Sequence, residues 1–434
     1  MADLATPKPC DLQLSNGFVV TMANGGEICW PGFVAIQGRD IVGVGPSERA
    51  DEWRAAIILD CSDSVILPGF INCHVHAGIS LLKAAAAAAD LLREPEIAWS
   101  FIEATTEDSA YVGTRLGCLQ MMKAGITTFA DMWPFPDANA EAVKSVGMRA
   151  VLAPYTRSYD ARGFDTIASA ASRWMDDRLT PAIGIHSLRD CSRETLRLAG
   201  DAARAHDLKV HADAARSKAG VGDGWRIAEA KEMGVLRRGT VLVGCADATE
   251  EEINVAAECG AGIACVPVSD AQLARSVSPL SRWKQRMLVG LGTDISGAQG
   301  RHDFFDEMRM AILMDRVSIE DSKLKPRDVL EMATIDGARV LGMEHTIGSL
   351  EIGKRADLIT VRLDDPRFAP LHWDRPDQVL SHLLFAAAPI DIATVIVDGR
   401  VLFRNRRALH LDEEEIVRES REASTTCLAK AGLK

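Results

Sequence analysis

The chain has 434 residues, of which 47% are hydrophobic and 25% are charged. These shares are typical of a folded globular protein and argue against intrinsic disorder. The 61 acidic residues outnumber the 49 basic ones, so the formal net charge is −12. Nucleic-acid binding usually needs a basic face, and we therefore expect no nucleic-acid partner.

No segment predicts insertion into a membrane or secretion. Apolar stretches such as 65–73 contain Pro or Gly and are too short to span a bilayer. The first ten residues lack the basic and apolar regions of a secretory signal. The ten cysteines form no CxxC pair, which is typical of free thiols in a reducing compartment. We expect a cytoplasmic protein without a disulfide framework.

Both ends of the chain read as short strands. Four runs near the N-terminus combine β-branched or alternating apolar residues with flanking Gly or Asn, namely 11–14, 18–22, 33–37 and 41–45. Near the other end, 356–362 and 392–397 have the same character. Asp398 and Gly399 then predict a hairpin turn into 401–403. Strands from the two ends could pair into one small sheet domain.

In the long middle, strand-like runs alternate with helical patterns. The eight strand candidates are 65–76, 127–132, 149–154, 182–186, 209–213, 240–244, 262–266 and 288–294. Eight such units match an α/β fold of the (β/α)8 TIM-barrel type, although periodicity alone does not exclude a doubly wound open sheet. We expect three parts, which are a composite β-sandwich of 1–66 and 350–411, a barrel over 67–349 and a C-terminal helix at 412–434.

The strongest chemical signal is the string PGFINCHVH at 68–76. His74 and His76 are two residues apart on a predicted strand, so they point to the same face. At the C-terminal end of a barrel strand, that face belongs to the mouth where active sites lie. Two ordinary histidines on a half-buried strand are the plainer alternative, but two neutral imidazoles also make a natural metal pair.

Two more ligand-type residues end later strands. His211 follows Leu208-Lys209-Val210, and Asp294 closes the string GLGTD. Together with the histidine pair they would enclose one divalent metal ion and leave a position for water. Three histidines and one aspartate accept either zinc or iron.

These residues belong to a wider resemblance that covers nearly the whole chain. The strings that carry it are 68–76, 125–132 (GITTFADM), 289–294 (VGLGTD), 347–358 (IGSLEIGKRADL) and 395–400 (VIVDGR). In them the chain resembles the amidohydrolase superfamily, in its chlorohydrolase/aminohydrolase (TRZ/ATZ-like) and cytosine-deaminase-like branch. The resemblance implies a barrel with a small β-sandwich, a mononuclear zinc or iron site on His74, His76, His211 and Asp294, and a homodimer or larger homo-oligomer.

The sequence departs from this family at two positions. Members with aminohydrolase activity usually carry a Glu three residues after the strand-five His, where this chain has Ala214. They also carry a His at the end of strand six, where this chain has Gly244. In the family the Glu is expected to move a proton to the heterocycle nitrogen and the His to orient the water. Losing one positioned acid or base typically lowers a rate by about 10²–10⁴-fold, so family-type deamination is doubtful here.

Other residues are candidates for substrate contacts. His186 matches a substrate-contacting histidine of the family and is a candidate for catalysis or binding, with a structural barrel-end histidine as the alternative. Asp270, where relatives often have Asn, could bind an amine-bearing substrate or be a solvated loop acid. Asp131 is a third candidate for substrate binding. Three further carboxylates near strand ends could replace the missing proton carriers, namely Asp190, Asp213 and Asp247.

These features predict a metal-dependent hydrolase that acts on a C–N or C–halogen bond of a small cyclic or heterocyclic substrate. The metal would lower the pKa of water and polarise the electrophilic carbon, with Asp294 as general base. One alternative is a degenerate, non-catalytic family member that binds a ligand or a partner subunit, as Ala214 and Gly244 suggest. Another is metal-assisted lyase or cyclisation chemistry on the same ligands.

Overall fold

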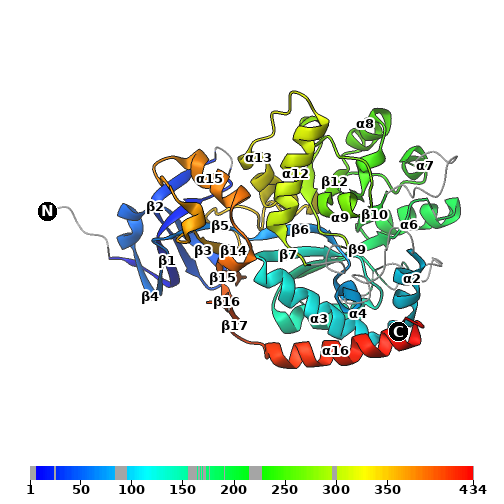
Figure 1. The fold of residues 1–434 in the computed structure, drawn as a ribbon, viewed down its shortest axis with the longest axis horizontal. Coiled ribbons are helices and arrows are strands. Elements are labelled where there is room, and N and C mark those ends of the chain that lie inside the picture. The colour runs from blue at the N-terminus through cyan, green and yellow to red at the C-terminus, as the bar shows by residue number, and fades with distance from the viewer. Residues whose placement is uncertain are drawn as a thin grey trace.

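The computed structural model describes residues 6–433 apart from 24–25, 84–94, 190, 215–226, 296–300 and most of 155–175. A sheet built from both chain ends lies beside an eight-stranded barrel, and helices cover the outside of the barrel (Figure 1). Among the described residues, no helix combines the length and the apolar character that crossing a membrane requires.

The barrel strands run parallel and follow one another in chain order. They are β6 (Phe70–Val75), β7 (Ile126–Asp131), β8 (Arg149–Leu152), β9 (Leu179–Ile185), β10 (Lys209–Asp213), β11 (Val241–Val243), β12 (Gly262–Cys265) and β13 (Val289–Leu291). Each overlaps one of the eight predicted runs, and the predicted α/β barrel is confirmed. Nearly all of their residues are buried, because helices cover the outside and side chains fill the interior.

The last strand returns to the first, which excludes the open-sheet alternative. The carbonyl of His74 accepts hydrogen bonds from the backbone N–H groups of Thr293 and Asp294, at 2.9 and 3.0 Å. The Asn72 side chain adds two more contacts at this seam. It donates to Oγ1 of Thr293 at 2.8 Å and accepts from the Thr293 N–H at 3.0 Å. Backbone and side chain thus hold β6 against the end of β13.

Several of the covering helices begin at polar capping residues. Thr106 caps α3, Ser192 caps α6, and Thr249 caps α8 in a capping box with Glu252. The described helices include α2 (Pro95–Ala104), α3 (Glu107–Lys123), α4 (Pro136–Val146), α6 (Arg193–Ala205), α7 (Ile227–Glu232), α8 (Glu250–Glu258), α9 (Pro267–Gln272), α10 (Leu280–Trp283), α12 (Phe304–Ser318), α13 (Pro326–Met332), α14 (Ile335–Leu341), α15 (Pro376–Phe385) and α16 (Glu413–Lys430).

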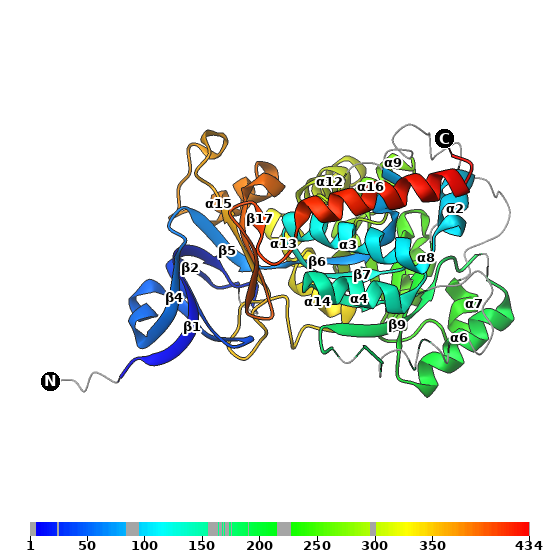
Figure 2. The same cartoon turned by 90° about the horizontal axis from the view of Figure 1, so that it is seen from below.

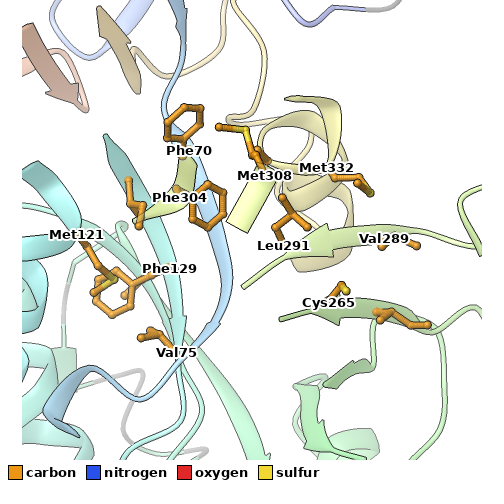
Figure 3. Close-up of a cluster of buried hydrophobic side chains, with 14 of the residues drawn as sticks. Phe70, Val75, Met121, Phe129, Cys265, Val289, Leu291, Phe304, Met308 and Met332 are labelled. Carbon is orange, nitrogen blue, oxygen red and sulfur yellow. The ribbon is translucent and has the colours of Figure 1, made fainter. Parts of the chain in front are cut away.

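A buried aromatic cluster joins β6 to α12. Phe70 stacks on Phe304 with ring centroids 5.5 Å apart and meets Phe305 edge-on at 5.3 Å. Met308 and Leu291 belong to the same buried cluster (Figure 3). Burying a phenylalanine side chain is worth about 1.5–3 kcal/mol, and aromatic pairs add to this. The cluster therefore anchors the strand that carries the histidine pair.

The second sheet joins strands from both ends of the chain, as predicted. Its strands are β1 (Lys8–Val20), β2 (Ile28–Gln37), β3 (Asp40–Pro46), β4 (Trp53–Asp60), β5 (Ser64–Pro68), β14 (Leu358–Arg362), β15 (Ile392–Val397), β16 (Arg400–Arg404) and β17 (Arg407–Ala408). The N-terminal and C-terminal groups meet where β5 pairs antiparallel with β14. Asp398 and Gly399 form the predicted turn between β15 and β16, both with positive φ.

Several strands differ from the prediction. The run 65–76 divides at Gly69 into β5, in the end sheet, and β6, in the barrel. A β-carbon at Gly69 would lie 2.1 Å from Oγ1 of Thr127, so only glycine fits this crossing. The runs 11–14 and 18–22 form the single strand β1, whose pairing with β2 shifts register around Gly17. The strands β4 and β17 were not predicted.

The C-terminal helix α16 lies along α3 and reaches α2 (Figure 2). Arg115 of α3 pairs with Glu415 and Glu419 of α16, at 3.5 and 3.1 Å. Near its far end, Oγ of Ser424 donates to the carbonyl of Leu81 at 2.6 Å. Leu81 belongs to the 3-10 turn η2 (Ala77–Leu82), which directly follows the histidine pair.

A buried ion-pair network ties the barrel to the end sheet. Arg149 of β8 binds Asp357 through two hydrogen bonds, at 2.8 and 3.2 Å, and Asp398 through one, at 3.1 Å. All three side chains are less than 10% exposed. Removing one partner of such a network leaves buried charge without compensation, which typically costs about 3–5 kcal/mol.

We expect Arg149→Ala to lower the free energy of unfolding by about 3–5 kcal/mol, because it removes the guanidinium that pairs with the buried carboxylate of Asp357 and one of the cations beside Asp398. Urea denaturation measures the change. The matched control is Arg197→Ala, which removes a guanidinium from exposed ion pairs with Glu194 and Asp201 and should cost less than about 1 kcal/mol. Equal losses for the two variants would contradict this account.

Candidate metal centre and its cavity

Three buried side chains converge at the mouth of the barrel. His74 lies on β6, His76 directly precedes the turn η2, and Asp294 follows β13. Nε2 of each histidine lies 3.5 Å from Oδ1 of Asp294. One potential ligand atom from each of the three residues lies within 4.8 Å of the others.

The chemistry of these three groups fits a divalent metal ion. Nε2 of His74 is buried and has no hydrogen-bond partner, which is rare for a buried polar atom and costly without a ligand. Nδ1 of His76 donates to the carbonyl of Met132 at 2.6 Å, so its Nε2 carries the free lone pair. Burial and the nearby His74 lower the pKa of His76 to about 4, which keeps its ring in the neutral, metal-binding form.

His211 lies beside this group rather than within it. It sits on β10, and its Nε2 is 2.9 Å from Nδ1 of His74. Burial and the neighbouring His74 and His76 hold the pKa of His211 well below its usual value, so this ring is neutral too. The structure therefore brings three of the four predicted ligands into one group, and it places His211 against the far nitrogen of His74.

Asp294 is held in place from its other side. Oγ of Ser269 donates to Oδ2 of Asp294 at 2.5 Å, and Nη1 of Arg275 lies 3.8 Å from the same oxygen. The backbone of Asp294 is left-handed, with φ of 46°, a conformation that Asp tolerates better than most residues. Burial opposes ionisation, but His74, His76 and Arg275 together hold the pKa of Asp294 well below its usual value.

A cavity of about 200 Å³ opens onto this group. Among the described residues, its polar lining is formed by His76, His186, Asp213, Arg275 and Asp294. The apolar wall that the described residues form consists of Ile79, Ala98, Trp99, Ile102, Leu273 and Ile295. The rings of Trp99 and His186 meet at 4.6 Å between centroids, and His186 lies 5.7 Å from the ring of His76. The cavity thus combines an aromatic wall with a charged floor, as small-molecule sites commonly do.

Two predicted substrate contacts lie outside the lining of this cavity. Asp131 is buried, and its Oδ1 accepts from the backbone N–H of Ala77 at 2.8 Å, so it supports the turn after the histidine pair. Asp270 is also buried, which excludes a solvated loop acid, and its Oδ1 lies 3.3 Å from Nη1 of Arg275. Both carboxyl groups have their pKa raised to about 7, chiefly by burial.

The three carboxylates proposed as replacement proton carriers differ in their position relative to the cavity. Asp213 lines the cavity. Oδ1 of Asp247 accepts from the backbone N–H of Ser276 at 3.3 Å, and Asp247 is not in the lining. Asp190 lies outside the described residues.

The two departures from the family pattern, Ala214 and Gly244, directly follow β10 and β11. Ala214 follows β10 and is buried. Gly244 follows β11 with a left-handed φ of 68° and begins the turn η3 (Cys245–Asp247). A histidine here would have to adopt a backbone conformation that costs side-chain-bearing residues about 1–2 kcal/mol.

Sequence reasoning missed three residues that shape the site. Ser269 and Arg275 hold Asp294, and Trp99 forms part of the cavity wall. Ser269 stands next to Asp270, so the same string could have pointed to it. Trp99 and Arg275 lie in segments whose pattern carries no signal of the cavity.

Comparison with known proteins agrees with this geometry. A model described as amidohydrolase family matches residues 65–402. The 5-methylthioadenosine/S-adenosylhomocysteine deaminase of Syntrophobacter fumaroxidans is 33% identical over 434 residues, covering 96% of this chain and 98% of its own. A solved structure of a zinc-bound adenosine deaminase from Xanthomonas campestris superimposes with a TM-score of 0.89 at 26% identity, covering 98% of this chain and 100% of that one.

A zinc complex of the atrazine chlorohydrolase TrzN from Arthrobacter aurescens shares the fold, with a TM-score of 0.84 at 21% identity over 95% of this chain and 100% of that one. The family resemblance predicted from the sequence is thereby confirmed, and the His-His-Asp group agrees with the predicted divalent metal. The chain therefore belongs to the amidohydrolase family.

Proposed function

We propose that this protein hydrolyses a C–N bond that joins an amine to a small heterocycle, with one zinc or iron ion held by His74, His76, His211 and Asp294. The observation that carries the proposal is the buried, partnerless Nε2 of His74, which faces Asp294 and His76 beneath the cavity. When bound, the ion supplies an activated water and polarises the carbon that is attacked.

The chain's own residues have distinct parts in this proposal. Asp294 accepts the proton of the attacking water and returns it to the leaving amine. Ser269 and Arg275 keep its Oδ2 occupied, so Oδ1 is the oxygen that faces the histidines. His186 and Trp99 provide rings against which a flat heterocycle can stack.

The relatives support a purine-type heterocycle as the substrate class. Two of the similar proteins are named as deaminases of adenosine or of its thioether derivatives. A nucleobase-sized ring matches the scale of a cavity of about 200 Å³ with one aromatic wall. A homo-oligomer, a cytoplasmic location and C–halogen chemistry stay predictions.

Ala214 and Gly244 favour a second candidate function. Neither residue can transfer a proton, and the proposed reaction needs a proton on the leaving amine. A chain in which Asp294 does not replace the missing groups would bind a heterocycle without converting it.

Metal analysis tests the ligand set. We expect native protein purified without chelators to hold about one divalent ion per chain. His74→Ala should lose both the ion and turnover, because it removes one of the metal ligands. His345→Ala is the control, since the His345 side chain is 96% exposed and does not line the cavity. A full complement of metal in His74→Ala would refute the assignment.

The hydrogen bond from Ser269 to Asp294 makes a second prediction. Ser269→Ala should weaken metal affinity by about 10–100-fold, the usual effect of removing a group that orients a ligand. Competition with a chelator of known affinity measures it. The control is Ser62→Ala, which removes a Ser–Asp hydrogen bond of 2.6 Å at the surface. Unchanged affinity in Ser269→Ala would show that this bond does not orient the ligand.

A substrate panel separates the two candidate functions. Zinc-loaded and iron-loaded protein would be incubated with adenosine, 5-methylthioadenosine, S-adenosylhomocysteine and atrazine, and ammonia, chloride and other products would be measured. We expect ammonia from at least one purine. Binding of a purine by calorimetry without any product would instead establish the non-catalytic function.

A further inference from the structure

Arg275 stands between three carboxylates next to the metal-binding group. Its Nη1 lies 3.3 Å from Oδ1 of Asp270 and 3.8 Å from Oδ2 of Asp294, and the negative charge of Asp213 also acts on it. The side chain is only 18% exposed, and it lines the cavity. Among the described residues of that lining, Arg275 is the one permanent cation.

The segment of Arg275 reaches across to the end of β11. The N–H of Ser276 donates to Oδ1 of Asp247 at 3.3 Å, in the turn that Gly244 begins. On the adjoining strand, Asp213 pairs with Val243, the residue before Gly244. A cationic side chain from a neighbouring loop therefore stands close to a strand end that contributes no side chain of its own.

The proposed reaction creates a need for such a cation. When water attacks the carbon, a C–O bond forms and the electron pair of the C=N or C=O bond moves onto the ring nitrogen or oxygen. The proton of the water passes to Asp294 and then to the amine, which leaves as the C–N bond breaks. Until that bond breaks, the ring heteroatom carries negative charge that a fixed hydrogen-bond donor would stabilise.

We infer that Arg275 donates a hydrogen bond to the ring heteroatom that gains charge during attack, and so is a catalytic residue of the reaction. This inference rests on the proposed hydrolase function. A guanidinium presents donors only and stays protonated, so it cannot serve as a base. Arg275 consequently selects heterocycles that offer an unprotonated acceptor next to the attacked carbon.

The kinetic test compares Arg275→Gln and Arg275→Lys with the native zinc-loaded enzyme on its best substrate. We expect Arg275→Gln to lower kcat by about 10²–10³-fold with little change in KM, as for a donor used mainly in the transition state. Arg275→Lys should retain part of the rate, and both variants should hold about one ion per chain when they are loaded with saturating zinc. The control is Arg282→Gln, which changes an exposed arginine a few residues away.

The binding test needs no turnover. Barbiturate is a six-membered heterocycle whose negative charge is shared among its oxygens, so it probes the same donor. We expect calorimetry to show that the native zinc-loaded chain binds it about 10–100-fold more tightly than Arg275→Gln does, the worth of one charge-assisted hydrogen bond.

Distinct results would overturn the two proposals. A native chain that converts no member of the substrate panel overturns the proposed function, and the barbiturate comparison still tests Arg275. Full kcat in Arg275→Gln, loss of metal in both Arg275 variants, or no difference in barbiturate binding each overturns the role of Arg275 and leaves the hydrolase function standing.

Discussion

The metal centre depends on the hydrogen bonds that close the barrel. The carbonyl of His74 accepts the N–H groups of Thr293 and Asp294, which joins the first barrel strand to the last and brings the Asp294 carboxylate against both imidazoles. Such close approach needs glycine at 292, because a β-carbon there would lie 2.9 Å from the backbone of His74. One contact therefore serves both the fold and the site.

Charge balance is the second constraint on the site. The carboxylates of Asp213, Asp270 and Asp294 surround the single guanidinium of Arg275, and buried charges are tolerated only when they are compensated. Burial already raises the pKa of Asp270 to about 7. A divalent cation beside Asp294 would offset part of the remaining negative charge, so the residues around the ligands also favour a metal ion.

Much of the fold and the ligand set could be predicted from the sequence, because short local patterns indicate both. Eight buried strands alternate with helices, and the ligands stand at strand ends, where the fold brings them together. The break at Gly69 escaped prediction because it depends on a contact with Thr127, far along the chain. Arg275 was missed for a similar reason. Its position depends on the conformation of its loop and on its contacts with Asp270 and Asp294. Asp270 was considered as a solvated acid because nothing local signals its burial.

The most direct measurement of the central claim is zinc X-ray absorption spectroscopy of the loaded native chain. A site of histidines and one aspartate predicts a first shell of nitrogen and oxygen only, at about 2.0–2.2 Å, with the outer-shell scattering of imidazole rings. A sulfur neighbour at about 2.3 Å would mean that the metal is bound by one of the ten cysteines, and it would contradict the account.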